Sequence, residues 1–238
     1  ELFADALWQY FVAGYADLRV ERDDGYIGRE DVAWYFTTWR DFPLHEKRAL
    51  KFARGRVLDV GCGAGRHSLY LQNRGLNVTA IDVSPDAVAL AQARGVRDVR
   101  VANVCSKLPF HDAEFDTVIL FGNNLGIGGT VPRLCKMLRE LYRITSSRGR
   151  ILATTRMPSM TNPAHLRYLR RNLARGCAIG QIRMRLVLNG EHGAWFDLLL
   201  LAPTDLMQIT AQAGWEIAQL FPLESFELGY SVVMEKQQ

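Results

Sequence analysis

The distribution of apolar residues predicts alternating strands and helices over the middle of the chain. The predicted strands cover residues 57–60, 78–81, 99–102, 115–121 and 149–155. The helices between them cover residues 64–74, 85–95 and 131–145. The second of these helices has a clear start, because Ser84 is a good N-cap and Pro85 fits the first helical position. Strands that alternate with helices need crossover connections, which predicts a mostly parallel sheet.

The remainder of the chain departs from this alternation. The elements predicted there are a helix from Asn162 to near Gly176, strands at 181–188 and 194–201, a helix capped by Thr204, and strands at 215–221 and 230–235. The first two of these strands flank a turn with two glycines, which predicts a β-hairpin. A short link joins the last two strands, so we expect an antiparallel pair that closes one edge of the sheet.

Together these elements predict an α/β fold. Its core is a doubly wound, Rossmann-like, seven-stranded sheet that is mostly parallel, with an antiparallel last strand. Residues 1–54 are expected to form an N-terminal helical extension that acts as a lid. Residues 55–238 are expected to form the main domain, with a helix–hairpin insertion at about 156–202, after the fifth strand.

Composition narrows the class of protein. With 238 residues, 48% of them hydrophobic and 23% charged, the chain suits a globular domain with its own core. Four cysteines lie far apart without a C-x-x-C pair, so we expect reduced thiols, no metal site and a cytoplasmic location. The longest apolar run is far shorter than the roughly 20 residues of a membrane span, and the N-terminus lacks the basic start of a signal peptide.

The charge pattern leaves two interpretations of the partner open. The net charge is +4, and six arginines fall between Arg167 and Arg185. Such a run occurs in proteins that bind nucleic acid. More often it is the solvated face of a helix, and this interpretation is favoured here.

The strongest candidate chemistry lies where the first predicted strand meets its helix. Gly61, Gly63 and Gly65 form the turn between them. Glycines let the backbone approach a ligand closely, and the helix N-terminus behind them offers free N–H groups. The spacing is G-x-G-x-G, whereas dinucleotide-binding folds have G-x-G-x-x-G, which argues against an NAD-dependent oxidoreductase.

Asp82 is the second candidate, because it ends the next predicted strand. A carboxylate at this place can accept both ribose hydroxyls of a nucleoside. The alternative is that Asp82 caps the following helix. Ser84 already fills that role, so we favour ligand binding.

Three motifs taken together resemble the class I S-adenosylmethionine-dependent methyltransferases. They are VLDVGCGAGR at 57–66, AIDVSP at 80–85 and LPFHDAEFDTV at 108–118. The resemblance covers roughly residues 50–235 and is closest to the bacterial type 11 group of small-molecule methyltransferases. It implies S-adenosylmethionine as the cofactor and S-adenosylhomocysteine as the product.

The resemblance also implies the residues that bind this cofactor. In that family the glycine turn holds the methionine part, which implicates Asp59, Gly61, Gly63 and, through its backbone, Cys62. The acid after the second strand binds the ribose and the next residue lies against the adenine; these positions are Asp82 and Val83.

The chain departs from the family between residues 102 and 107. The acidic residue usually found near the adenine amino group is absent, and Val104 occupies its place. We expect Val104 and Cys105 to meet the adenine ring through their backbone N–H groups, with Asn103 as a compensating polar side chain.

After the fourth strand the family presents residues to the transferred methyl group. This chain has Phe121, Gly122, Asn123 and Asn124 there. Phe121, Gly122 and Asn123 are candidate cofactor contacts, Asn123 is also the candidate catalytic residue, and Asn124 is a candidate acceptor contact. Both asparagines also suit the glycine-rich turn that follows, which is the alternative. No general base stands out.

The N-terminal extension is rich in aromatic residues, and Tyr26 and Tyr35 are its candidate substrate or lid residues. Aromatic faces attract a sulfonium cation by roughly 0.5–2 kcal/mol. A closed lid would also exclude water from the site. The alternative is that these rings only pack the extension onto the domain.

The sequence therefore predicts an enzyme that transfers a methyl group from S-adenosylmethionine to an oxygen, nitrogen or carbon of a small molecule, by in-line displacement. Two alternatives remain: a tRNA or rRNA methyltransferase, and a non-catalytic protein that binds S-adenosylmethionine. We expect a small-molecule partner, no nucleic-acid or membrane partner, and a monomer or homodimer.

Overall fold

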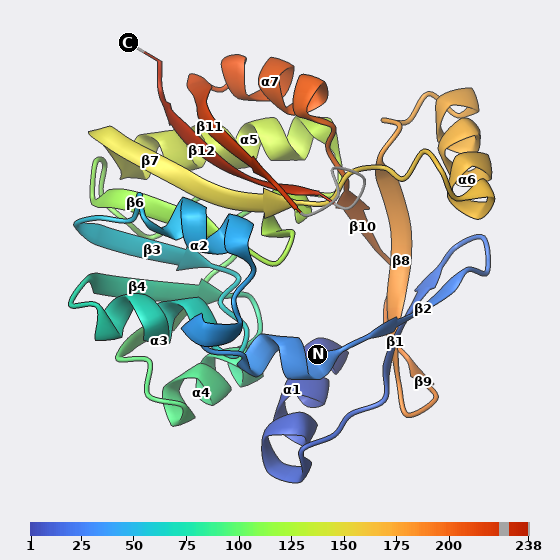
Figure 1. The fold of residues 1–238 in the computed structure, drawn as a ribbon, viewed down its shortest axis with the longest axis horizontal. Coiled ribbons are helices and arrows are strands. Elements are labelled where there is room, and N and C mark those ends of the chain that lie inside the picture. The colour runs from blue at the N-terminus through green and yellow to red at the C-terminus, as the bar shows by residue number, and fades with distance from the viewer. Residues whose placement is uncertain (224–228, 238) are drawn as a thin grey trace.

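The computed structural model describes residues 1–223 and 229–237, which form two sheets (Figure 1). The main sheet has seven strands in the order β11-β12-β7-β6-β3-β4-β5. They are β3 (Arg56–Val60), β4 (Asn77–Asp82), β5 (Asp98–Val101), β6 (Phe115–Leu120), β7 (Thr145–Thr155), β11 (Trp215–Pro222) and β12 (Tyr230–Lys236). The five strands from β7 to β5 are mutually parallel. The last strand, β12, is antiparallel to both of its neighbours, which confirms the predicted sheet.

Helices cover both faces of the main sheet. One apolar cluster joins the sheet to α5 (Val131–Ile144) and α7 (Pro203–Ala211). On the other face, apolar clusters join it to α2 (Leu44–Leu50), α3 (Arg66–Asn73) and α4 (Pro85–Ala93). Burial of apolar surface on both faces explains why the parallel strands are nearly continuous apolar runs. None of the helices in the described residues is long and apolar enough to span a membrane.

Two helix starts test the capping predictions. Ser84 caps α4 as predicted, because its hydroxyl accepts a hydrogen bond from the N–H of Ala87 at 3.3 Å. Thr204 was expected to cap the later helix, and this is wrong. That helix, α7, begins at Pro203 with Ala202 as the N-cap residue and no side-chain cap. Proline suits the first helical position because its φ is preset and it lacks the N–H that would stay unpaired there.

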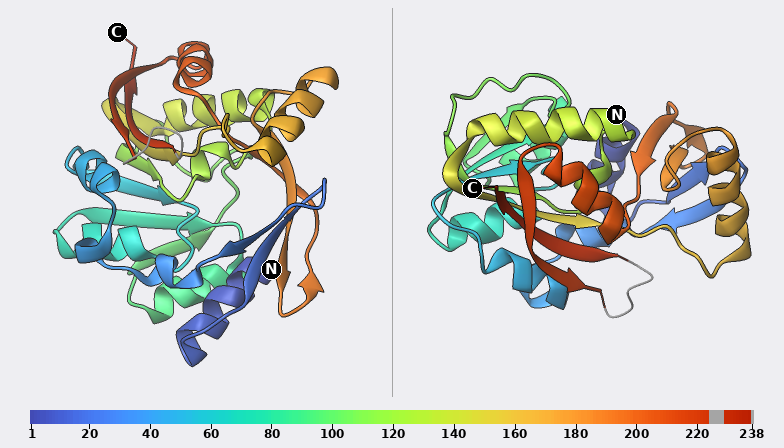
Figure 2. Two further views of the ribbon diagram at one scale, coloured as in Figure 1. Left: turned by 45° about the vertical axis from the view of Figure 1, so that its right-hand side comes forward. Right: turned by 90° about the horizontal axis from the view of Figure 1, so that it is seen from above.

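The second sheet combines strands from the N-terminal extension with strands from the insertion after β7. Its strands are β1 (Leu18–Arg22), β2 (Ile27–Glu30), β8 (Gln181–Leu188), β9 (Glu191–His192) and β10 (Phe196–Leu199). The order is β10-β8-β1-β2, with β9 paired to β8, and every pair is antiparallel. The sheet stands across the carboxyl ends of the parallel strands (Figures 1 and 2). It therefore lies on the side where open α/β sheets bind ligands.

The second sheet contains both segments that the sequence set apart from the main domain. The extension has the expected helices, α1 (Leu2–Ala13) and α2, but also the β1–β2 hairpin and two short 3-10 helices, η1 (Val32–Phe36) and η2 (Trp39–Asp41). The insertion has the predicted helix, α6 (Pro163–Ala174), and the predicted hairpin. Because β1 pairs with β8 along its whole length, extension and insertion form one structural unit.

Candidate active site

The glycine turn between β3 and α3 depends on backbone angles that favour glycine. Gly61, Gly63 and Gly65 have φ of +69°, +51° and +76°. A Cβ atom on Gly61 would lie 2.5 Å from the Asn124 amide nitrogen. A Cβ atom on Gly63 would make only ordinary contact, 3.7 Å from Leu7 Cδ1. Gly63 is therefore required for its left-handed conformation, whereas Gly61 is required for space as well.

Asp82 lies beside this turn, as the sequence predicted. Its Oδ2 accepts a hydrogen bond from the N–H of Gly63 at 3.0 Å, and its Oδ1 accepts one from the N–H of Ser84 at 3.0 Å. The carboxylate thus connects the carboxyl ends of β3 and β4. Asp82 does not cap α4, since the Ser84 side chain does so. Its contact with ribose stays a prediction.

Asp59, at the end of β3, and Cys62, in the glycine turn, are both buried. The Ser68 hydroxyl donates a hydrogen bond to Asp59 Oδ2 at 2.6 Å, which ties β3 to α3. Burial raises the pKa of Asp59, and His67 and Ser68 act against that rise. Burial also raises the pKa of the Cys62 thiol, so it stays protonated. The Cys62 N–H is already used, because it donates to the Ile81 carbonyl at 3.1 Å.

The residues predicted on the adenine side differ in exposure. Val83 is 62% exposed at the carboxyl end of β4, so its apolar surface is open to a ligand. Val104 is buried in the main core cluster. The Cys105 N–H donates to the Asn103 side chain at 2.9 Å. Val83 is therefore the best placed of these residues to contact adenine.

The two asparagines after β6 hold the ends of three strands together. The N–H of Asn123 donates to Thr154 Oγ1 at 3.1 Å, and its side-chain oxygen accepts from the N–H of Arg156 at 2.8 Å. Its amide nitrogen is buried without a hydrogen-bond partner within the described residues. The Asn124 amide nitrogen donates to the carbonyls of Val60 and Gly61, both at 2.9 Å. Asn124 thus stabilises the glycine turn through hydrogen bonds from its amide nitrogen.

The other two residues of this segment also have defined places. Phe121 is buried, with its ring centroid 4.6 Å from that of His67. Gly122 has a φ of +73°. Both lie directly before η3 (Asn124–Gly126) and its N-cap, Asn123, at the carboxyl end of β6. The predicted contacts of Phe121 and Gly122 with the cofactor stay predictions.

The N-terminal extension covers the glycine turn. Phe3 and Leu7 of α1 are the side chains nearest to Gly63. The indole N–H of Trp8 donates to the carbonyl of Asp86, at the start of α4, at 2.9 Å. The Phe3 ring also meets the Tyr35 ring edge-on, with centroids 4.9 Å apart. The extension therefore packs against the same backbone that the sequence assigns to the cofactor.

A buried charge cluster fixes η1 to the start of α3. Arg66 donates to both carboxylate oxygens of Glu46, at 3.0 and 3.1 Å, and to Thr37 Oγ1 at 3.0 Å. His67 Nε2 lies 3.0 Å from Glu46 Oε2. Burial would raise the pKa of Glu46, but His67 and Arg66 outweigh it, and the pKa is lowered overall. Sequence analysis did not identify this cluster, because nothing local marks Glu46 as buried.

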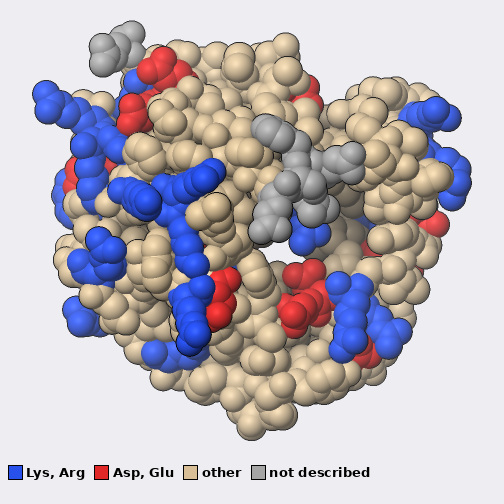
Figure 3. Space-filling view, in the orientation of Figure 1, with Lys and Arg blue, Asp and Glu red and all other residues tan. Residues whose placement is uncertain are grey.

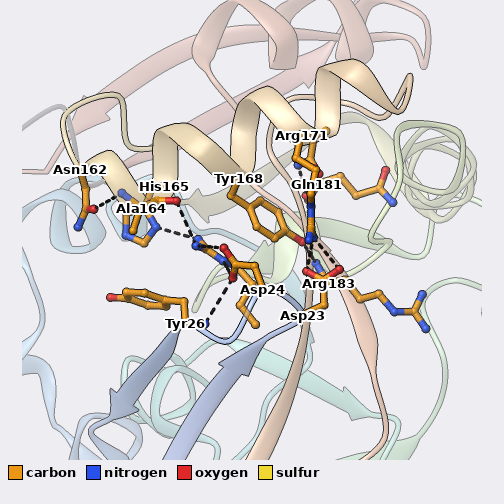
Figure 4. A network of polar contacts seen from close by, with 12 residues as sticks. Asp23, Asp24, Tyr26, Asn162, Ala164, His165, Tyr168, Arg171, Gln181 and Arg183 are labelled. Carbon is orange, nitrogen blue, oxygen red and sulfur yellow. Dashed lines mark hydrogen bonds and ion pairs between the residues drawn. The ribbon is translucent and has the colours of Figure 1, made fainter.

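Tyr35 and Tyr26, the two predicted lid residues, lie in different surroundings. Tyr35 is partly buried, and its hydroxyl donates to Glu30 Oε1 at 2.8 Å. Tyr26 is 41% exposed at the start of β2, and its ring meets that of His165 on α6 edge-on. In Figure 4 the Tyr26 hydroxyl points away from the neighbouring polar network. Only Tyr35 is thus close to the glycine turn through Phe3.

Ion pairs hold the β1–β2 turn against α6 (Figure 4). Arg22 donates to both carboxylate oxygens of Asp24, at 2.7 and 2.8 Å, and lies 2.8 Å from His165 Nδ1. Arg171 of α6 pairs with Asp23 at 2.6 Å. The two adjacent acids are therefore engaged by arginines. Within residues 1–223 and 229–237 no group of three histidine, cysteine or acidic side chains could hold a metal ion.

An opening separates the main domain from the second sheet. Figure 3 shows it near the centre of the molecule, with acidic side chains along one rim. The carboxyl ends of the parallel strands point toward this region in Figure 1. The opening is thus placed where a ligand could reach the ends of β3, β4 and β6.

Replacing Gly63 with valine is expected to abolish binding of S-adenosylhomocysteine. The left-handed backbone at Gly63 is strained for any L-residue, at a cost of roughly 1–2 kcal/mol, and a β-branched side chain is worse. The branched methyl groups would also crowd Leu7 and Phe3. Calorimetry on protein whose circular dichroism is unchanged is the measurement. Normal affinity in such a protein would rule out a cofactor contact at this turn.

Comparisons with known proteins agree with the geometry. A family model described as a methyltransferase domain matches residues 57–149. Malonyl-[acyl-carrier protein] O-methyltransferase of Erwinia billingiae is 39% identical over 100 residues, which are 42% of this chain and 38% of that protein. The chain thus matches well under half the length of such curated relatives.

Solved structures resemble the chain over a greater length. A methyltransferase of Bacteroides fragilis, crystallised with S-adenosyl-L-homocysteine, has a TM-score of 0.83 and 26% identity, covering 99% of this chain and 94% of its own. A methyltransferase of Methanosarcina mazei has a TM-score of 0.67 and 20% identity over 82% of this chain, which shows the fold alone. Residues 57–149 thus match a methyltransferase domain, and the chain over nearly its whole length is similar to a solved S-adenosylmethionine-dependent methyltransferase.

Proposed function

We propose that this chain transfers a methyl group from S-adenosylmethionine to a small-molecule acceptor. One observation carries the proposal: the left-handed glycine turn is hydrogen-bonded to Asp82 at the carboxyl ends of two adjacent parallel strands. This is where open α/β sheets bind nucleotides. The whole-chain similarity to a protein crystallised with S-adenosyl-L-homocysteine supports it.

The donor and acceptor groups present at the site fit this cofactor. Asp82 offers a carboxylate for the ribose hydroxyls, Val83 offers an exposed apolar surface for adenine, and the turn offers close backbone approach for the methionine part. The cofactor supplies an electrophilic methyl group when bound. What remains for the protein is to orient the acceptor, which can contribute roughly 7–11 kcal/mol to lowering the barrier.

We also propose that the N-terminal extension acts as a lid over the site. Support comes from α1 and η1, which pack on the glycine turn through Phe3 and Leu7 and through the bonds of Arg66. A cover of this kind excludes water from the reacting groups. Deleting residues 1–40 would also remove β1, which pairs with both β2 and β8. Point substitutions at Tyr35 and Tyr26 therefore test the lid better than truncation does.

The acceptor itself is proposed only as a small molecule. The relatives named as acting on malonyl-[acyl-carrier protein] match less than half of this chain and less than half of their own length. An RNA acceptor is less well supported by the arginine run. Arg171 pairs with Asp23 and Arg185 with Glu21, so two of the six arginines serve the fold. The others, Arg167, Arg170, Arg175 and Arg183, are exposed, as on a solvated surface.

RNA binding is expected to be weak at physiological salt and without sequence preference. Exposed arginines attract phosphates non-specifically. Binding releases counterions from the RNA, and because this release is less favourable at higher salt, the affinity falls steeply. A filter-binding series with tRNA and an unrelated RNA, from low to physiological salt, measures it. Tight binding of one RNA that survives physiological salt would favour the RNA methyltransferase.

The proposed activity is tested with S-adenosylmethionine labelled in its methyl group and a panel of small metabolites with hydroxyl, amine, carboxylate or activated carbon nucleophiles. The expected result is label transfer to at least one of them, with S-adenosylhomocysteine formed in equal amount. Label transfer to RNA alone would replace the small-molecule acceptor. Tight cofactor binding without transfer to any acceptor would favour the non-catalytic alternative.

A further inference from the structure

Glu30 was not a candidate from the sequence. In the structure only one of its two carboxylate oxygens accepts a hydrogen bond within the described residues. It ends β2, and its Oε1 accepts the hydrogen bond from the Tyr35 hydroxyl at 2.8 Å. Burial and Glu30 both raise the pKa of Tyr35, so the phenol keeps its proton and remains the donor. Within residues 1–223 and 229–237, Glu30 Oε2 has no hydrogen bond or ion pair. One oxygen is therefore positioned and the other is available.

The strand register sets the direction in which Glu30 points. In the β1–β2 ladder Glu30 lies opposite Leu18, and directly opposed residues point to the same face of a sheet. Leu18 is fully buried, in a cluster with Leu7 of α1 and Ala64 of the glycine turn. Glu30 therefore faces the methyltransferase domain, not the solvent side of the second sheet.

Contacts of Tyr35 place the pair above the glycine turn. The Phe3 ring touches Tyr35, and Phe3 Cε1 lies 3.8 Å from the position of a Cβ on Gly63. Arg66, the first residue after the turn, donates to the Trp34 carbonyl at 3.4 Å and to Thr37 Oγ1 at 3.0 Å. Tyr35 thus lies between Phe3, which covers Gly63, and the segment that is hydrogen-bonded to Arg66.

The nearby cations do not neutralise Glu30. Arg66 is paired with Glu46. Arg156, at the carboxyl end of β7, forms no ion pair within the described residues. The positive charges of Arg156 and Arg66 both act against the rise in the pKa of Tyr35 but do not outweigh it. No cation within hydrogen-bond distance of Glu30 competes for its free oxygen in the described part of the chain.

We propose that Glu30, oriented by Tyr35, is a cofactor-binding residue that attracts the positively charged sulfonium of S-adenosylmethionine and so favours it over S-adenosylhomocysteine. The product has a neutral thioether sulfur, so it gains nothing from this carboxylate. The inference rests on the proposed function. In this way a residue of the second sheet would discriminate between S-adenosylmethionine and S-adenosylhomocysteine.

Calorimetric titration with both ligands, at one pH and salt, tests the proposal without any acceptor. Glu30→Gln keeps an oxygen for the Tyr35 hydroxyl but removes the charge. We expect it to bind S-adenosylmethionine about tenfold more weakly, as for loss of one partly buried charge interaction. S-adenosylhomocysteine affinity should change less than twofold. Tyr35→Phe, which frees the carboxylate, should show a smaller loss with the same selectivity.

Glu21→Gln is the matched control. Glu21 lies on the adjacent strand, on the opposite face of the same sheet, and pairs with Arg185 at 2.8 Å. Both affinities should match the wild type in this variant. Equal losses for the two ligands in Glu30→Gln, or no loss, would overturn the proposal, because the charge would then not act at the sulfur. A wild-type protein that binds neither ligand would instead refute the proposed function.

Discussion

Replacement of Asp82 with alanine is expected to weaken binding of S-adenosylmethionine by about ten- to a hundredfold. Hydrogen bonds to a charged group contribute roughly 1.5–3 kcal/mol, and the variant loses those to the ribose. It also releases the N–H groups of Gly63 and Ser84, each 3.0 Å from this carboxylate, so the turn loses its support. Titration calorimetry on the folded variant measures the effect.

A matched control for this variant lies four residues further on. Asp86 is exposed in the first turn of α4, and no hydrogen bond involves its carboxylate within the described residues. Asp86→Ala should leave affinity close to that of the wild type. Unchanged affinity in Asp82→Ala would remove Asp82 from the cofactor site.

Replacement of Glu46 with alanine is expected to cause the largest loss of stability. Arg66 would stay buried without the carboxylate to which it donates at 3.0 and 3.1 Å. Breaking a buried ion pair by removing one partner costs roughly 3–5 kcal/mol. Urea unfolding monitored by circular dichroism measures the free energy of unfolding.

The control for Glu46 is a more exposed ion pair where β1 begins. Asp17 and Arg19 lie 2.9 Å apart at the surface, so Asp17→Ala should cost about 1 kcal/mol or less. The pKa of Glu46 is lowered in the folded protein, so its contribution is present above the ordinary carboxyl range and is lost as pH falls through the lowered pKa. A loss below 1 kcal/mol in Glu46→Ala at neutral pH would contradict the structural role of the cluster.

The main sheet could be predicted from the sequence because its information is local. Parallel strands covered on both faces are continuous apolar runs, which is how β3, β4 and β6 were found. The α4 cap was predictable for the same reason, since Ser84 and Pro85 signal a helix start by themselves. The sequence also predicted that the glycine turn and Asp82 lie close together, because they stand at the carboxyl ends of β3 and β4, which are adjacent parallel strands.

The hairpin of the insertion was predicted, but its pairing with β1 in the second sheet was not, because the signal for this pairing is not local. The sequence of β1, Leu-Arg-Val-Glu-Arg, is mostly charged, and its partner β8 begins at Gln181. Glu30 ends β2, and its direction follows from the β1–β2 register, in which it lies opposite Leu18. Likewise, the hydrogen bonds from the Asn124 amide nitrogen to the carbonyls of Val60 and Gly61 join segments far apart in the sequence and were not predicted. The contact of Asn124 with the acceptor stays a prediction. Long-range packing decides such roles.

A crystal structure of this protein with S-adenosylhomocysteine tests the central claim most directly. We expect the ribose hydroxyls on the Asp82 carboxylate, the adenine against Val83 and the amino-acid part along the turn that includes Gly63. Binding of the ligand elsewhere on the chain, or none at concentrations that fill the site of the Bacteroides fragilis protein, would contradict it.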